Sequence, residues 1–229
     1  MWLRMAFLLL FARPLARFLT GADVIGREHL PTTGPAIIAA NHSSHVDTLL
    51  LLTIFPSRLM PKLRPLAAAD YFLKGPLMSW FSRNLVGIVP VHRGGLAGED
   101  VLAPAREALA AGAIILMFPE GTRGDASGEM GRLRSGIAKL AEAFPDAPVT
   151  PVWIEGADRV LPKGAHVPAP MNCTVLVGEA MTWARDGAAF LPTLRERLLE
   201  LRRTSPPQHW RDPGPDQPPP SGAGAPSGR

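Results

Sequence analysis

Short apolar runs that end in polar clusters are the feature that most constrains how this chain can fold. The run at residues 35–40, Pro-Ala-Ile-Ile-Ala-Ala, follows a Thr-Thr-Gly turn and ends directly at Asn41. A second run, at residues 113–118, ends at Pro119. Continuous rather than alternating apolar residues are typical of strands that are covered on both faces. We therefore expect a buried strand at each run, followed by a polar loop.

Helical segments alternate with these runs along the chain. Strands that are covered on both faces and separated by helices predict an α/β fold with a mostly parallel central sheet flanked by helices. The expected helices span residues 47–55, 99–111, 135–144 and 190–203, and the further strands span residues 88–91, 149–154 and 173–177.

The first twenty residues contain an apolar run, residues 5–12, between basic residues. A helix of eight residues is only about 12 Å long, and a bilayer has a hydrocarbon core of about 30 Å, so the run is too short to span it. We expect an N-terminal helix that lies in the membrane interface. A helix packed on the protein's own core is the alternative. In the membrane interpretation the headgroup side holds Arg4, Arg13 and Arg17, and the bilayer side holds Trp2, Phe7, Phe11 and Phe18.

The composition changes abruptly at Ser205, where a segment rich in Pro, Gly and Ser begins and continues to Arg229. Such a segment has too little apolar surface to offset the entropy of ordering, so we predict that it is disordered. The expected organisation is a membrane-associating segment at 1–20, a catalytic domain at 21–204 and a disordered tail at 205–229.

The overall charge favours an anionic partner. The chain carries a formal net charge of +4, and 46% of its residues are hydrophobic. An acidic membrane surface or a phosphorylated substrate fits this combination. Nucleic acid does not, because no basic run is interleaved with aromatic residues. Cys173 is the only cysteine, which excludes an intrachain disulfide and fits a reducing cytoplasmic setting.

The polar cluster after the first strand contains a candidate catalytic pair. Imidazole suits the removal of a hydroxyl proton, and a carboxylate on its other ring nitrogen fixes the tautomer. His42 and Asp47 are five residues apart, about 140° around a regular helix, so they can pair only if His42 precedes the helix that Asp47 begins. Asp47 is also favoured there by the helix dipole alone. A metal site formed by His42, His45 and Asp47 is a further alternative.

The cluster after the second strand is suited to a phosphate. Gly121 permits close backbone approach, and Thr122 and Arg123 offer hydrogen-bond donors. Glu120 can orient arginines or accept a hydrogen bond from a substrate hydroxyl. Arg93, after the strand at residues 88–91, adds a second guanidinium. Read singly, these residues also fit an ordinary turn and a solvated surface arginine.

Together these motifs resemble the glycerolipid acyltransferase family, whose best-known members are bacterial lysophosphatidic acid acyltransferases. The resemblance covers residues 21–183, and its third motif, Glu-Gly-Thr-Arg, is matched completely. In the second motif, Pro90 stands where the family has an aromatic residue. The four motifs match, in chain order, at Asn41, His42 and Asp47, at Gly87, Val91 and Arg93, at Glu120 to Arg123, and along the strand at residues 149–154.

The resemblance implies a glycerol-3-phosphate acyltransferase-like fold and a one-step acyl transfer. His42, held by Asp47, takes the proton of a glycerol hydroxyl, which attacks the thioester of acyl-CoA or acyl carrier protein. The motif register selects His42 rather than His45. No metal or cofactor is implied. The acceptor phosphate is expected to bind Arg93 and Arg123, with Gly121 and Thr122, in a site shaped by Glu120.

The expected acceptor is 1-acylglycerol 3-phosphate, and the expected product is phosphatidic acid. Another lyso-lipid acceptor, such as a lyso-ornithine lipid or a lysophospholipid, is the alternative within the family. A non-catalytic lipid-binding protein and a metal-dependent hydrolase are alternatives from other classes. The family also implies peripheral or monotopic binding at the cytoplasmic face of the bacterial inner membrane.

Overall fold

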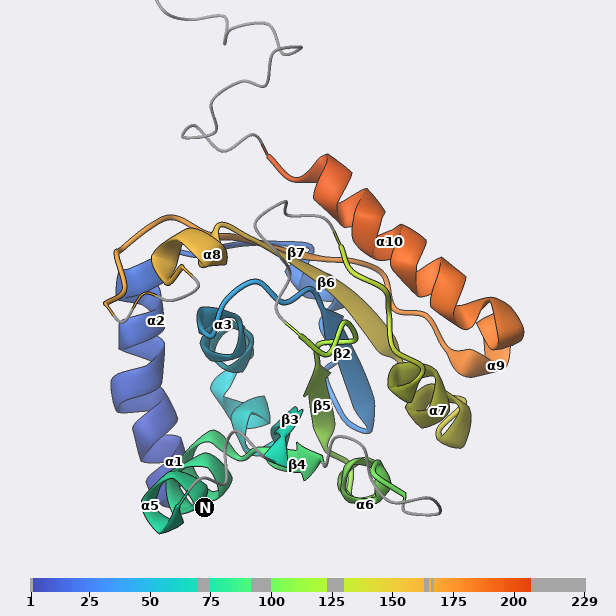
Figure 1. Cartoon of the computed structure of the whole chain (residues 1–229), viewed down its shortest axis with the longest axis horizontal. Coiled ribbons are helices and arrows are strands. Elements are labelled where there is room, and N and C mark those ends of the chain that lie inside the picture. The colour runs from blue at the N-terminus through green and yellow to red at the C-terminus, as the bar shows by residue number, and fades with distance from the viewer. Residues whose placement is uncertain are drawn as a thin grey trace, which may run out of the picture.

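One sheet forms the centre of the computed structural model, which describes residues 2–69, 75–91, 100–122, 130–162, 165 and 167–206 (Figure 1). Within these residues the sheet has seven strands in the order β1-β7-β6-β2-β5-β3-β4. Their bounds are Asp23–Ile25 (β1), Ala36–Ala40 (β2), Leu63–Ala68 (β3), Val89–Val91 (β4), Ile114–Met117 (β5), Val149–Glu155 (β6) and Thr174–Val177 (β7).

The sheet is mostly parallel, as predicted. β2 pairs in parallel with β5 on one side and with β6 on the other. β1 with β7, β3 with β5 and β3 with β4 are also parallel, and β6 with β7 is antiparallel. Because β2 and β5 are parallel neighbours, their carboxyl ends meet at the same edge of the sheet, which brings the two polar clusters together.

Two hydrophobic layers cover the sheet, one on each face. In β2, Ile38 and Ala40 belong to one layer, and Ile37 and Ala39 belong to the other. This explains why the run at residues 35–40 is apolar at every position. The first layer includes side chains of α2 (Arg13–Thr20), α3 (Val46–Ile54) and α8 (Ala157–Val160), and the second those of α6 (Ala103–Ala110), α7 (Gly136–Ala143) and α10 (Phe190–Thr204).

The remaining helical segments are short and connect these layers. They are α1 (Trp2–Phe7), the π-helical η1 (Leu8–Ala12), η2 (Arg27–His29), η3 (Ser57–Lys62), α5 (Pro76–Phe81), the π-helical η4 (Ser82–Val86), α9 (Trp183–Asp186) and η5 (Gly187–Ala189). The helix expected at residues 99–111 begins only at Ala103, and its end at Ala110 is followed by Gly112, which adopts φ +75°.

The N-terminal helical stretch, residues 2–20, packs one face on the core and exposes the other. Leu8 and Ala12 are buried in the first layer, whereas Phe11 and Phe18 are 67% and 71% exposed. The packed alternative is therefore correct for one face of the stretch. The placement of Arg4 at the headgroups was wrong, because Arg4 is buried.

Two further expectations concern the membrane and the tail. None of the described helices combines the length and the hydrophobicity that a membrane crossing requires. The predicted tail lies outside the described residues from position 207 onward, so its disorder stays a prediction.

Candidate active site

His42 and Asp47 contact each other at the carboxyl end of β2. β2 ends at Ala40 and α3 begins at Val46, so His42 lies in the intervening turn and Asp47 in the first helical turn. His42 Nδ1 lies 2.9 Å from Asp47 Oδ2. The His42 side chain is 17% exposed and that of Asp47 is fully buried. The pairing geometry inferred from the spacing is the one observed.

The Asp47 carboxylate is held by the turn that carries His42. Asp47 Oδ2 accepts hydrogen bonds from the backbone N–H groups of Ser43 and Ser44, at 2.7 and 2.8 Å. Because a carboxylate only accepts, His42 Nδ1 donates to it and Nε2 remains as the basic nitrogen. The sequence from 42 to 47 thus forms a closed unit that fixes both the tautomer and the orientation of the ring.

Phe118, immediately after β5, stacks on the imidazole of His42. The ring centroids are 4.2 Å apart, and the planes are inclined by 18°. In the sequence, Phe118 stands out only as the last residue of an apolar run. Its place in the chain could have indicated a role at the site. Phe118 directly precedes Pro119 and Glu120, so its ring lies at the end of the strand next to β2.

Glu120 holds the His42 turn through the backbone. Its Oε1 accepts a hydrogen bond from the His42 N–H at 3.3 Å, and its Oε2 accepts one from the Gly131 N–H at 2.8 Å. The residue is only 6% exposed. Both carboxylate oxygens therefore bind backbone groups, and the Glu120 carbonyl accepts a hydrogen bond from Arg134 Nε at 3.4 Å.

Asn41 fastens the other side of this turn. Its side-chain Nδ2 donates to the Ile154 carbonyl at 2.9 Å, and its Oδ1 accepts from the Ile154 N–H at 2.7 Å. The side chain thus continues the β2–β6 pairing past the end of the strand. This contact gives the first residue of the Asn-His motif a structural explanation.

Gly121 and Thr122 follow Glu120 directly and are both exposed. Gly121 adopts φ +74°, and a Cβ there would lie 3.3 Å from Arg134 Nε. The Arg134 N–H also donates to the Pro119 carbonyl at 2.8 Å. Arg134 is thus a basic neighbour of the motif, although it is not one of the predicted site residues.

Arg93 and Arg123 lie outside the described residues, so their predicted roles stay predictions. Of the predicted site residues, the structure brings together His42, Asp47 and Glu120, with Gly121 and Thr122 beside them. In the described part of the chain, no group of three or more His, Cys, Asp and Glu side chains is arranged to hold a metal ion. The alternative metal site at His42, His45 and Asp47 therefore has no support from geometry.

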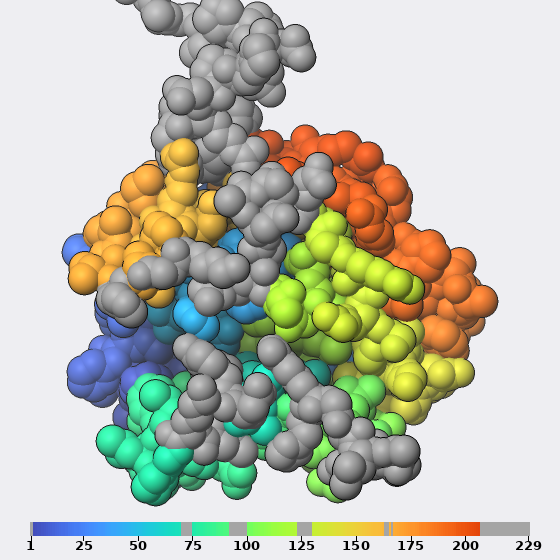
Figure 2. Space-filling model, in the orientation of Figure 1, coloured from blue at the N-terminus to red at the C-terminus, as the bar shows by residue number. Residues whose placement is uncertain are grey.

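The segment after β2 reaches the molecular surface. In the space-filling view its light-blue atoms lie between the orange segment around α8 and the green segment around β5 (Figure 2).

Comparison with known proteins gives consistent matches. The chain is 29% identical over 146 residues to the chloroplastic 1-acyl-sn-glycerol-3-phosphate acyltransferase BAT2 of Brassica napus, a match that covers 63% of this chain and 40% of the relative. It is 29% identical over 191 residues to the 1-acyl-sn-glycerol-3-phosphate acyltransferase of Pseudomonas aeruginosa, covering 82% and 70%. The chain thus spans less than half the length of the Brassica relative.

A solved structure has the same fold. The 1-acyl-sn-glycerophosphate acyltransferase PlsC of Thermotoga maritima superposes with a TM-score of 0.72 at 23% identity, covering 87% of this chain and 78% of that chain. The family model described as Acyltransferase matches residues 21–155, which is more than half of the 229 residues. With this match and a His–Asp pair assembled at the end of β2, the chain belongs to the acyltransferase family.

Proposed function

We propose that this chain transfers a fatty acyl group from acyl-CoA or acyl carrier protein to the free hydroxyl of 1-acylglycerol 3-phosphate, forming phosphatidic acid. The observation that carries the proposal is the contact between His42 Nδ1 and Asp47 Oδ2, which leaves Nε2 as a base at the edge of the sheet. The names of the Brassica and Pseudomonas relatives support this acceptor.

The proposed reaction proceeds in one displacement without an acyl-enzyme. His42 Nε2 takes the proton of the acceptor hydroxyl while the oxygen attacks the thioester carbonyl carbon. The tetrahedral intermediate then expels the thiolate, which accepts from the imidazolium the proton that His42 took from the hydroxyl. Asp47 stabilises the imidazolium between these steps. The step needs neither a metal nor a cofactor beyond the thioester co-substrate.

The acceptor phosphate is proposed to bind beside this pair, at the motif that follows β5. Gly121 offers close backbone approach and Thr122 a hydroxyl, and Arg93 and Arg123 are proposed to supply guanidinium groups. Arg134, which packs over Gly121, adds positive charge at the same place. A phosphate bound there would orient the glycerol hydroxyl toward His42.

The protein is proposed to act as a peripheral or monotopic enzyme at the cytoplasmic face of the inner membrane. Exposed aromatic side chains on the N-terminal helices and on α5 support binding to a bilayer, since Trp2 is 89% and Trp80 48% exposed. The two regions touch, because Phe7 and Phe81 pack edge to face with centroids 5.4 Å apart. We call the exposed apolar side chains of these two touching regions the apolar face, and Leu10, Phe11, Phe18 and Leu77 are among them.

An acyl-transfer assay on the purified protein with a panel of acceptors tests this function. We expect phosphatidic acid from 1-acylglycerol 3-phosphate, and loss of turnover in His42→Ala with the fold intact. His45→Ala is the matched control and should be milder, because the motif register excludes it as the base. Acylation of only a lyso-ornithine lipid or another lysophospholipid would overturn the acceptor assignment.

The same assay separates the other classes of function. A non-catalytic lipid-binding protein would bind the acceptor but release no thiol from the donor, and His42→Ala would then behave like the unmodified protein. A metal-dependent hydrolase would lose activity in the presence of strong chelators. We expect turnover that chelators do not diminish.

A further inference from the structure

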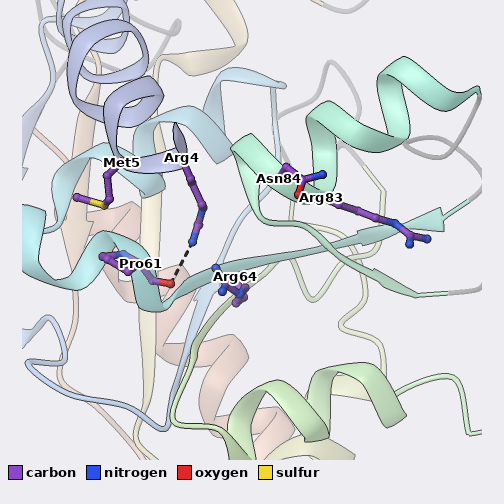
Figure 3. Close-up of a pocket in the computed structure, with 6 residues that line it drawn as sticks. All are labelled: Arg4, Met5, Pro61, Arg64, Arg83 and Asn84. Atoms are coloured by element: carbon purple, nitrogen blue, oxygen red, sulfur yellow. Dashed lines mark hydrogen bonds between the residues drawn. The ribbon is translucent and has the colours of Figure 1, made fainter. Parts of the chain in front are cut away.

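A pocket rich in arginine lies between α1, the junction of η3 with β3, and η4 (Figure 3). Its volume is about 270 Å³. None of its lining residues is acidic, and three of them carry a positive charge. The pocket is lined by Arg4, Met5, Pro61, Arg64, Arg83 and Asn84.

Arg4 is the buried member of this set, at 7% exposure. Its guanidinium donates to the carbonyls of Pro61 at 3.0 Å, Leu63 at 2.6 Å and Val86 at 3.1 Å. Its Nε is buried and has no partner within the described residues. Burial and the nearby charge of Arg64 lower the pKa of Arg4 to about 10. Carbonyl groups thus solvate a charge that has no carboxylate partner in the described structure.

The backbone is shaped to leave room for this guanidinium. Gly87 adopts φ +80°, and a Cβ at that position would lie 2.6 Å from Arg4 Cζ. Any other residue would push the Arg4 side chain away from the carbonyls that hold it. Burying a charge without a counter-ion costs free energy. We therefore expect that the space that the fold provides for this guanidinium serves a function.

Arg64 and Arg83 bring further positive charge to the pocket. Arg64, on β3, is half-buried, and burial lowers its pKa. Arg4 and Arg64 lie side by side near Pro61, whereas the exposed Arg83 extends outward from η4 (Figure 3). Adjacent guanidinium groups repel each other, and a bound anion with several oxygen atoms relieves this repulsion. Phosphate is such an anion.

The surroundings of the pocket indicate where the phosphate comes from. α1 contacts both η3 and η4, so the pocket adjoins the apolar face formed by the N-terminal helices and α5. In the space-filling view the blue N-terminal segment and the teal segment around α5 meet at one corner of the molecule (Figure 2). Leu3 on α1 is 58% exposed, and Leu77 on α5 is 79% exposed. A phosphate here would have apolar protein surface next to it, as the headgroup of a membrane lipid requires.

The pocket shares no lining residue with the described part of the catalytic site. Arg64 pairs in register with Ile115 of β5, whereas the site lies past the end of that strand at Met117. We propose that the pocket binds the phosphate of an anionic phospholipid in the membrane surface, in addition to the acceptor at the His42 site. The bound headgroup neutralises the accessible Arg64 and Arg83, above the buried Arg4, and seats the apolar face against the bilayer.

Binding of the full-length protein to vesicles tests this proposal. The probes are phosphatidylcholine vesicles with and without phosphatidylglycerol, which is neither substrate nor product of the proposed acyl transfer. The test variant is the double change Arg64→Gln and Arg83→Gln, which spares the buried Arg4. The matched control, Arg185→Gln with Arg195→Gln, removes the same charge from exposed positions on α9 and α10.

We expect the pocket variant to lose about tenfold in affinity for the phosphatidylglycerol vesicles, and the control variant less than about threefold. Binding to phosphatidylcholine alone should be equal in all three proteins. Equal losses in both variants, or no loss in the pocket variant, would overturn the proposal. Inorganic phosphate that binds the pocket without competing with vesicles would instead identify a soluble ligand and overturn the lipid assignment.

Thermal melting followed by circular dichroism establishes that each variant is folded. If the double variant melts early, Arg83→Gln alone changes only an exposed side chain and should still cost about threefold in vesicle affinity. Unchanged affinity in that folded single variant would then count against the pocket. Because this experiment measures vesicle binding alone, a negative result is distinguishable from a failure of the proposed acyl-transfer reaction.

Discussion

The imidazole of His42 is held by contacts of three different kinds. Asp47 bonds Nδ1, Phe118 stacks on the ring and Glu120 bonds the backbone N–H. The first contact fixes the tautomer, the second the tilt of the ring and the third the place of the turn. Each contact can be removed separately, so each makes a prediction of its own.

Phe118→Leu tests the stacking contact while keeping an apolar side chain. Aromatic pairs contribute about 0.5–1.5 kcal/mol beyond their buried area, so misorientation of the ring should lower kcat about three- to tenfold. KM for the acceptor should change little. Phe144→Leu is the control, because Phe144 is equally half-buried but packs in the second layer. Steady-state kinetics that show equal losses in both variants would contradict the positioning role of Phe118.

Glu120→Gln tests whether this carboxylate positions the turn or contacts substrate. The glutamine amide can accept a hydrogen bond only through its oxygen. Either the His42 N–H or the Gly131 N–H would therefore face the amide NH2, which is itself a donor. An unsatisfied buried donor costs about 1–3 kcal/mol, so the melting temperature and kcat should both fall. The KM for the acceptor should stay within about twofold of the original value. An increase confined to KM would show that Glu120 binds substrate.

At the residue scale, the sequence was sufficient to predict a contact between residues that are close together in the chain. The five-residue separation of His42 and Asp47 determined how they had to lie if they paired, and they lie so. Phe118 and Glu120 contact His42 from 76 and 78 positions away in the chain, and Glu120 and Gly131 are 11 positions apart. Spacing along the chain contains no information on such contacts.

At the scale of elements, the sequence predicted β2, β4, β5, β6 and β7, whereas β1 and β3 were missed. β2 and β5 are apolar throughout because helices cover both of their faces. β1 has only three residues at the edge of the sheet, and β3 contains Arg64 and Pro65, so neither shows an apolar run. Their strand conformation comes from pairing with β7 and β5, which is a tertiary effect.

Gly87→Ala tests how tightly η4 is fitted to the N-terminal helix. The left-handed conformation costs a non-glycine residue about 1–2 kcal/mol, and here the Cβ would also displace the Arg4 guanidinium. We expect a loss of about 3 kcal/mol in the free energy of unfolding, since the carbonyls of Leu63 and Val86 also lose their donor. Denaturant titration measures it.

Gly112→Ala is the matched control for this change. Gly112 has nearly the same φ, +75°, but the nearest atom to a Cβ there is 4.0 Å away. It should therefore lose only the conformational part, about 1 kcal/mol. Equal losses at the two positions would mean that Gly87 is required for its backbone angle alone and not for the space that Arg4 occupies.

At the scale of the whole molecule, Arg4 shows where reasoning from sequence fails. Its position before an apolar run predicts a headgroup contact, and local pattern offers nothing against it. Its observed partners are 57 to 82 positions away in the chain and come from η3, β3 and η4. The tertiary fold determines whether such an arginine is exposed or buried. Here Arg4, which was expected on the headgroup side of the N-terminal helix, is buried and lines a pocket.

Cys173 offers a probe of the stability of the whole fold. It is 2% exposed, directly before β7, and burial, assisted by the negative charges of Asp47, Asp158 and Glu155, raises its pKa from 9.0 to about 12. The thiolate is the reactive form, so iodoacetamide should label the native protein only through opening of the structure. Mass spectrometry should show slow labelling in buffer and rapid labelling in denaturant.

The same shift predicts an alkaline limit to stability. Between about pH 9 and 12 the unfolded thiol loses its proton while the folded thiol retains it, so the free energy of unfolding should fall as the pH rises through this window. Cys173→Ala should remove that part of the slope, while other alkaline titrations persist in both proteins. Denaturant midpoints measured across the window give the two slopes. Parallel slopes, or fast labelling of the native protein, would contradict a buried, protonated thiol next to β7.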